Sequence, residues 1–85
     1  MKQENLRAIL ENIVDRQLLY NDPPEAFNAY ERLVKEEAFS DEEARSLISR
    51  TIKIELFRLM RYAEPFNKQR FARNLAKLPD LPNVD

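Results

Sequence analysis

The stretch that decides the fold is NDPPEAF, Asn21 to Phe27, which places two prolines side by side in an 85-residue chain without glycine. Proline is tolerated in the first turn of a helix, because its missing N–H would have no intrahelical partner there. It also disfavours helical geometry in the residue before it, so the pair ends any preceding helix. Asp22 is a favoured N-cap residue and Glu25 falls at the third helical position, which together predict a capping box. The prolines therefore separate one helix from the next.

The segments on either side of the prolines have the apolar spacing of amphipathic helices. Before them, over about Lys2 to Tyr20, apolar residues recur three and four positions apart: Leu6, Ile9, Leu10, Ile13 and Val14. After them, the same spacing recurs in Ala26, Phe27, Tyr30, Leu33 and Val34. It fades in the acidic run KEEAF, residues 35–39. We expect two helices that each pack one face against the rest of the chain.

A second start signal, FSDEEA at residues 39–44, predicts the third helix. Ser40 is the expected cap, and Glu43 completes a capping box. Pro65 cannot continue a helical hydrogen-bond ladder, so we expect the helix to span Asp41 to about Tyr62. At about 1.5 Å per residue it would be roughly 33 Å long, long enough to be the central element. Its main apolar stripe is predicted to contain Ala44, Ile48, Ile52, Leu56, Leu59 and Met60.

A third start signal, PFNKQRF at residues 65–71, predicts a short fourth helix, about Lys68 to Lys77. Asn67 is the expected cap, and Phe66 before it can contact Phe71 one turn into the helix. The residues expected to face inward are Phe71, Leu75 and Leu78.

These signals predict an all-α fold, a compact four-helix bundle-like domain with a long central third helix. Each helix is marginal alone and depends on packing against the others. We expect one domain over residues 1–78. The end of the chain, LPDLPNVD, has two prolines and no apolar period, so residues 79–85 are expected to form an extended or flexible tail.

The composition excludes several classes of function. Without cysteine or histidine the chain has no thiolate nucleophile, no histidine base and no zinc site of the usual ligands. Without glycine it lacks the backbone of phosphate-binding and dinucleotide-binding loops. Clustered acidic residues alone are a poor catalytic signature. We therefore expect no enzyme, no cofactor and no small-molecule substrate.

The chain also lacks the signals of a membrane or secreted protein. No apolar run approaches the roughly 18 residues that cross a bilayer, and the start MKQENLRAIL has no apolar signal segment. We expect a cytoplasmic protein that does not bind membranes.

Charge is distributed unevenly along the chain. Residues 22–43 have a net charge of −6 and residues 44–77 a net charge of +7, although the whole chain has a net charge of −1. The helix dipole favours acidic residues at the start of the third helix and arginines towards its end, which accounts for part of this pattern. The polarity also suits binding to an acidic protein partner or to another copy of the chain.

A second apolar sector of the third helix lies among arginines. The simpler interpretation is that Leu47, Ile54 and Phe57 are buried against the first or fourth helix. If they are exposed instead, they form an apolar patch ringed by arginines, as expected of an interface core. Our leading hypothesis is a protein-interaction module or homodimer that uses this sector, with candidate residues Leu47, Arg50, Ile54, Phe57 and Arg61.

Nucleic-acid binding is the alternative hypothesis. Lys68 and Arg70 lie in the first turn of the fourth helix, where positive charge opposes the helix dipole, so another interaction should favour them. Their role could be to contact phosphates. The candidate contacts are Arg58, Arg61, Lys68, Arg70, Arg73 and Lys77. The near-neutral net charge and the absence of a DNA-binding signature count against this hypothesis.

The motifs DPPE, ERLVKEEAFSDEEA and IELFRLMRYAEPFNKQRFARNLAKLP together resemble a family of small bacterial proteins of unknown function. The resemblance covers about Ile13 to Pro82. Members often have glycine in the loop before the third helix, where this chain has Ala38 and Phe39. The resemblance implies a helical fold and supplies no activity, substrate or catalytic residue.

Overall fold

Four α-helices make up most of the computed structural model, which describes residues 3–81. In chain order the elements are α1 (Gln3–Tyr20), α2 (Pro24–Glu31), a π-helical turn η1 (Arg32–Glu36), α3 (Asp41–Tyr62) and α4 (Lys68–Lys77). No strand occurs among the described residues. The predicted all-α, four-helix bundle-like fold is confirmed.

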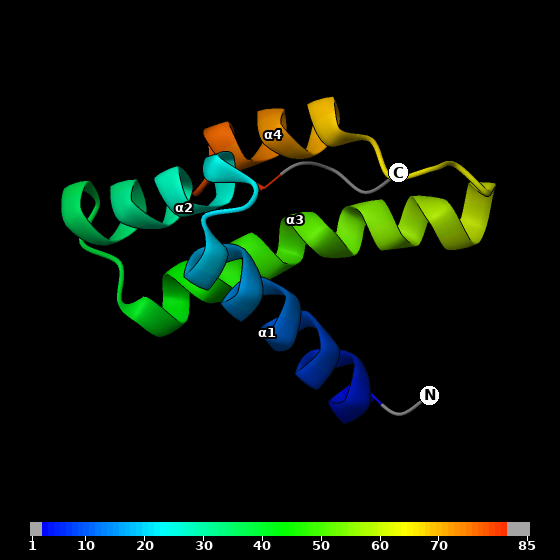
Figure 1. The fold of residues 1–85 in the computed structure, drawn as a ribbon, viewed down its shortest axis with the longest axis horizontal. Helices are drawn as coiled ribbons and strands as arrows, with labels where there is room; N and C mark the ends of the chain where they lie inside the picture. Colours follow the sequence, from blue (N-terminus) through cyan, green and yellow to red (C-terminus); the bar gives the residue numbers. More distant parts are fainter. Residues whose placement is uncertain (1–2, 82–85) are drawn as a thin grey trace.

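The long helix α3 is the centre of the arrangement, and it contacts each of the other three helices. Helices α2 and α4 contact each other and run opposite to α3, whereas α1 crosses α3 obliquely and diverges from it towards the N-terminus (Figure 1). The molecule measures 36 × 26 × 23 Å. At about 1.5 Å per residue, α3 spans nearly all of the longest dimension.

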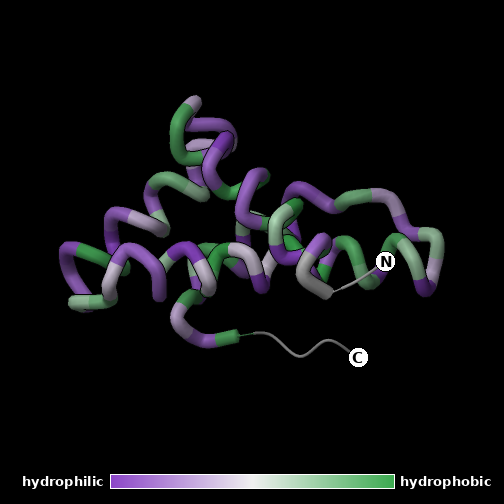
Figure 2. Tube along the Cα trace, turned by 90° about the horizontal axis from the view of Figure 1, so that it is seen from below, coloured by the Kyte–Doolittle hydropathy of each residue, from purple (hydrophilic) through white to green (hydrophobic). Residues whose placement is uncertain are grey.

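A single apolar core receives residues from all four helices. Its buried members are Leu10, Val14, Ala26, Ala29, Leu33, Ala44, Ile48, Ile52, Phe71, Leu75 and Leu78. Apolar residues recur between polar ones along each helix, as Figure 2 shows. The spacing of three and four residues therefore identified most of the inward face of each helix, but Ile9 of α1, also predicted on that face, is 42% exposed.

The predicted apolar stripe of α3 is wrong at its C-terminal end. Leu59 is 47% exposed and Met60 is 85% exposed, although both were expected in the core. Leu56, one turn earlier, is half-buried and packs against the core cluster. The last two turns of α3 thus extend beyond the helices that cover its earlier part.

Two of the three predicted helix starts have the expected cap. The Ser40 side chain accepts a hydrogen bond from the Glu43 backbone N–H at 3.0 Å, and the Glu43 carboxylate accepts one from the Ser40 N–H at 2.9 Å. The Asn67 side chain accepts a hydrogen bond from the Arg70 N–H at 2.9 Å. The phenyl ring of Phe66 contacts that of Phe71 edge to face, with 5.3 Å between ring centroids.

The predicted capping box at the prolines is wrong. The N-cap of α2 is Pro23, with an extended backbone and no side-chain hydrogen bond, so Asp22 lies one residue too early to cap the helix. Pro24 is the first helical residue. The prolines still end α1 and begin α2, because their fixed backbone angle suits the first turn and their side chains supply no acceptor.

Three helical segments are followed by a left-handed residue, which is Asn21 after α1, with φ 53°, and an alanine at the other two. Ala63 is the C-cap of α3, with φ 55° and ψ 30°, and Ala38 after η1 has φ 60°. The left-handed conformation costs an L-residue about 1–2 kcal/mol. Glycine would adopt it without steric penalty, so this glycine-free chain turns at the two alanines at a cost in stability.

The end of the chain is described only in part. Leu78 is buried as expected, and Leu81 is more exposed. Residues 82–85 of the predicted tail lie outside the described residues. Within residues 3–81, no helix has the length and apolar composition required to cross a membrane.

Replacing Ala63 by glycine is expected to stabilise the protein. Ala63→Gly relieves the left-handed backbone strain but makes the unfolded chain more flexible, so we expect a net gain of about 0.5–1 kcal/mol in the free energy of unfolding. The matched control is Ala8→Gly, at an exposed position inside α1, which should cost about 1 kcal/mol. Urea denaturation followed by circular dichroism measures both changes. A loss of stability in Ala63→Gly would contradict the prediction.

Candidate interaction site

Glu55 of α3 is a buried carboxylate that faces the start of α4. It is 1% exposed and lies on the core-facing side of α3, three residues after Ile52 and seven after Ile48. A charged group in this position is costly unless it is paired and its oxygens are hydrogen-bonded.

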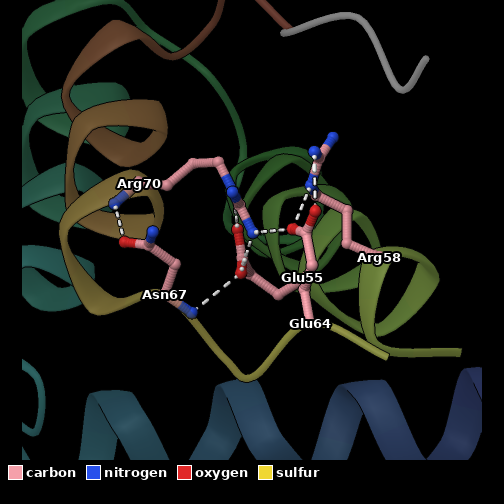
Figure 3. Close-up of polar contacts among 5 residues, drawn as sticks. All are labelled: Glu55, Arg58, Glu64, Asn67 and Arg70. Atoms are coloured by element: carbon pink, nitrogen blue, oxygen red, sulfur yellow. Dashed lines mark hydrogen bonds and ion pairs between the residues drawn. The ribbon is translucent and has the colours of Figure 1, made fainter. Parts of the chain in front are cut away.

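Arg70 and the start of α4 provide those partners (Figure 3). The Arg70 Nε donates to Glu55 Oε2 at 2.7 Å and its Nη2 donates to Oε1 at 2.9 Å, which makes the ion pair bidentate. The backbone N–H of Asn67 donates to Glu55 Oε1 at 3.0 Å. This pairing accounts for a basic residue in the first turn of α4, where the helix dipole opposes it.

A second ion pair extends the network towards the surface. The Arg58 guanidinium donates to both carboxylate oxygens of Glu64, at 2.8 and 3.2 Å. The Arg70 Nη2 lies 3.5 Å from the nearer Glu64 oxygen, so the two ion pairs are connected through Glu64 (Figure 3). The network therefore joins α3, the turn after it and α4.

The network shifts the pKa values of both carboxylates in the same direction. Burial would raise the pKa of Glu55, but the hydrogen bonds from Arg70 and the Asn67 N–H outweigh burial and lower it. The hydrogen bonds from Arg58 lower the pKa of Glu64. Both groups are thus held in the charged form.

Arg32 holds the other end of α4. Its Nη2 donates to the backbone carbonyl of Leu78 at 2.6 Å and to that of Leu75 at 3.3 Å. Leu75 lies in the last turn of α4, where its carbonyl also accepts the Leu78 N–H at 3.2 Å, and Leu78 is the residue that caps the end of the helix. Because Arg32 belongs to η1, this contact ties α4 to the end of α2.

A second polar cluster lies near the start of α3. Arg45 forms ion pairs with Asp15 of α1 and, at 2.9 Å, with Asp41 in its own helix. The Tyr30 hydroxyl of α2 donates to Asp41, and that hydrogen bond lowers the pKa of Asp41. The cluster connects the three helices α1, α2 and α3.

An open cleft of about 1010 Å³ lies between α1 and α3. Leu6, Leu10 and Val14 of α1 contribute apolar side chains to it. Its other lining residues are polar or charged: Arg7, Glu11, Asp15, Asp41, Glu42, Arg45, Ser46, Ser49, Arg50 and Lys53.

The predicted interaction sector does not form one exposed patch. Ile54 is 6% exposed and Leu47 is half-buried against the core, which is the simpler interpretation given above for these two residues. Phe57 is 37% exposed, and Arg50 and Arg61 are exposed. Exposure is therefore greatest at the C-terminal end of the sector.

Some of the candidate nucleic-acid contacts are held in ion pairs, and the others are exposed. Arg58 and Arg70 are engaged in the two ion pairs described above. The exposed candidates are Arg61, Lys68, Arg73 and Lys77. Asn74, between Arg73 and Lys77 on the same helix, is buried.

Exposed apolar side chains gather where α3 ends. We call this set the exposed apolar end of α3; its members are Phe57, Leu59, Met60 and Tyr62, with Phe66 in the following turn. The rings of Phe57 and Tyr62 meet edge to face, and the guanidinium groups of Arg58 and Arg61 lie over Tyr62 at 5.4 and 5.8 Å from its centroid. Exposed apolar side chains and arginines thus lie together at this end of the helix.

The described part of the chain contains no group of acidic side chains arranged to hold a metal ion. No family model, curated protein or solved structure matches this chain.

Removing Arg70 is expected to destabilise the protein strongly. Arg70→Ala leaves Glu55 buried without its cation, which should cost about 3–5 kcal/mol in the free energy of unfolding. The control is Arg73→Ala, three residues later on the exposed face of α4, which should change the free energy of unfolding by less than about 0.5 kcal/mol. Adding Glu55→Gln to Arg70→Ala removes the unpaired charge and should recover part of the loss. Equal losses for Arg70→Ala and Arg73→Ala in urea denaturation would refute the role of the pair.

Stability is expected to fall in acid because of Glu55. Its pKa is lower in the folded than in the unfolded chain, so its contribution is fully present above the unfolded value, about 4.3, and is lost as the pH falls through the folded value. The free energy of unfolding should therefore decrease below about pH 4.3, and less steeply in Glu55→Gln. The control is Glu36→Gln, an exposed carboxyl without an ion pair among the described residues. The measurement is thermal unfolding across this pH range. If the stability of Glu55→Gln and of wild type fell in parallel with decreasing pH, Glu55 would not be the source of the acid sensitivity.

Proposed function

We propose that this chain is a non-catalytic protein-interaction module whose contact surface is the exposed apolar end of α3. The observation that carries the proposal is the exposure of Phe57, Leu59 and Met60 within four residues of a helix whose earlier turns are packed. Exposed apolar clusters bordered by polar or charged groups are typical of protein–protein contact sites. Arginine and aromatic residues, both present here, are enriched among residues that dominate binding energy.

The charges of the surface favour a protein with acidic groups beside its apolar residues. Arg61 adds a positive charge at the rim, and Lys68 adds another at the start of α4. Complementary rim charges increase the rate and specificity of association more than the affinity.

We propose a non-catalytic function because the buried and half-buried acidic residues have structural partners. Glu55 and Glu64 are held charged by arginines and serve to join α3 to α4. The two carboxylates share the Arg70 guanidinium, and their hydrogen-bond donors among the described residues are arginines and the Asn67 N–H, with no nucleophile among them.

Nucleic-acid binding stays an alternative prediction with less support, because Arg58 and Arg70 already neutralise carboxylates. Membership of the small bacterial family and a cytoplasmic location also stay predictions from the sequence.

The proposal predicts that one exposed substitution abolishes partner binding without unfolding the protein. Met60→Glu places a charge in the apolar surface and should reduce retention of a bound protein at least about tenfold. Gln69→Glu adds the same charge on the exposed face of α4 and should leave retention unchanged. The measurement is affinity capture by wild type and both variants from lysates, with and without nuclease, after circular dichroism confirms folding.

Three results would contradict this function. Capture that is equal for wild type and Met60→Glu would show that the apolar end is not the contact surface. Capture lost on nuclease treatment would favour the nucleic-acid alternative. A wild-type protein that retains neither another protein nor a second, differently tagged copy of itself would remove the proposal altogether.

A further inference from the structure

One stripe of α3 connects the α1/α3 cleft with the exposed apolar end. Its members are spaced alternately four and three residues apart and therefore share one side of the helix: Glu42, Ser46, Ser49, Lys53, Leu56 and Met60. The first four line the cleft. Leu56 is half-buried, and Met60 belongs to the exposed apolar end. Alternating spacing of this kind allows two helices to pack along a common seam.

Two copies of this stripe can face each other if the two α3 helices run in opposite directions. A second α3 laid antiparallel, with the pair centred between Ser49 and Lys53, brings Leu56 opposite Ser46. Met60 then lies opposite the first turn of the other helix. Leu56 of each copy thus meets the small Ser46 that borders the open cleft of the other copy, and Met60 lies beside Glu42, on both sides of a two-fold axis. A parallel pair would place large residues against large ones and leave both clefts open.

The charges beside the stripe are arranged in the same way. The first turn of α3 is acidic, with Asp41, Glu42 and Glu43, and its last turn carries Arg61. An antiparallel pair places Arg61 of each copy beside the acidic first turn of the other. Among the described residues Arg61 has no carboxylate partner within ion-pair distance, so it is available for this contact.

We propose that the protein bound by the exposed apolar end is a second copy of this chain. In the complex, each copy places its apolar end over the α1/α3 cleft of the other, in one reciprocal two-fold contact. The cleft of about 1010 Å³ has room for side chains of the size of Leu56, Phe57 and Met60. This inference rests on the proposed function and adds to it the identity of the partner and the second surface, the cleft.

The first test separates the cleft from the apolar end. Sedimentation of the wild-type chain from micromolar to near-millimolar concentration is expected to show a monomer–dimer equilibrium. Ser46→Arg fills the cleft border without touching the apolar end, and it should raise the dimer dissociation constant at least about tenfold. Gln69→Arg, the same kind of change on the exposed face of α4, should leave the constant within about twofold.

The second test is an exchange of charges. Glu42→Arg and Arg61→Glu should each weaken the dimer, because each places like charges together at both ends of the contact. The double variant restores opposite charges and should return the dissociation constant towards the wild-type value. A fold defect cannot imitate this result, since both residues are exposed and the double variant contains both changes.

Each other outcome overturns the inference in a distinguishable way. A wild-type chain that stays monomeric, while Met60→Glu still abolishes capture of a different protein, refutes the second copy as partner and leaves the proposed function standing. A dimer that is unaffected by Ser46→Arg or not restored by the charge exchange refutes the reciprocal arrangement. A monomer with no protein partner refutes both.

Discussion

The ion pair between Glu55 and Arg70 fixes the position of the helix that completes the fold. A carboxylate buried as deeply as Glu55 costs several kcal/mol unless a cation and further donors reach it. Arg70 and the Asn67 N–H do so together, and this aligns the start of α4 with the middle of α3. With ten residues, α4 is too short to be stable alone. Arg32 holds its other end, so α4 is secured at both termini by polar contacts and along its length by apolar ones.

The exposure of the end of α3 follows from the same contact. Because α4 starts level with Glu55, the seven residues of α3 after it, about 10 Å of helix, extend past the helix that would cover them. The chain needs this length to turn at Ala63 and return to Glu55 through residues 64–67. Leu59 and Met60 are therefore exposed by the connection that buries Glu55, and the exposed apolar end of α3 is a direct consequence of the way the core is closed.

Local signals in the sequence predicted most of the fold. Ser40 and Asn67 were recognisable as caps because a cap depends on the residue itself and on the backbone two or three positions later. Asp22 has the same chemistry and fails, because the two prolines that follow place the first helical residue beyond its reach. The periodicity of α3 indicated the inward side correctly at Ile48 and Ile52. It could not indicate where the neighbouring helices end, and so Met60 was assigned to the core.

The interaction that organises the site was visible in the sequence as two separate anomalies. Glu55 is an acidic residue on the apolar side of α3, and Arg70 is a basic residue where the dipole of α4 disfavours it. Each alone has an ordinary explanation, such as a bend in the stripe or a phosphate contact. If the two residues lie on facing helices, they can form an ion pair. That pair offsets both the cost of burying Glu55 and the cost of placing Arg70 at the start of α4. That inference requires knowing that α3 and α4 are antiparallel neighbours, which the short turn at Pro65 implies but periodicity alone does not establish.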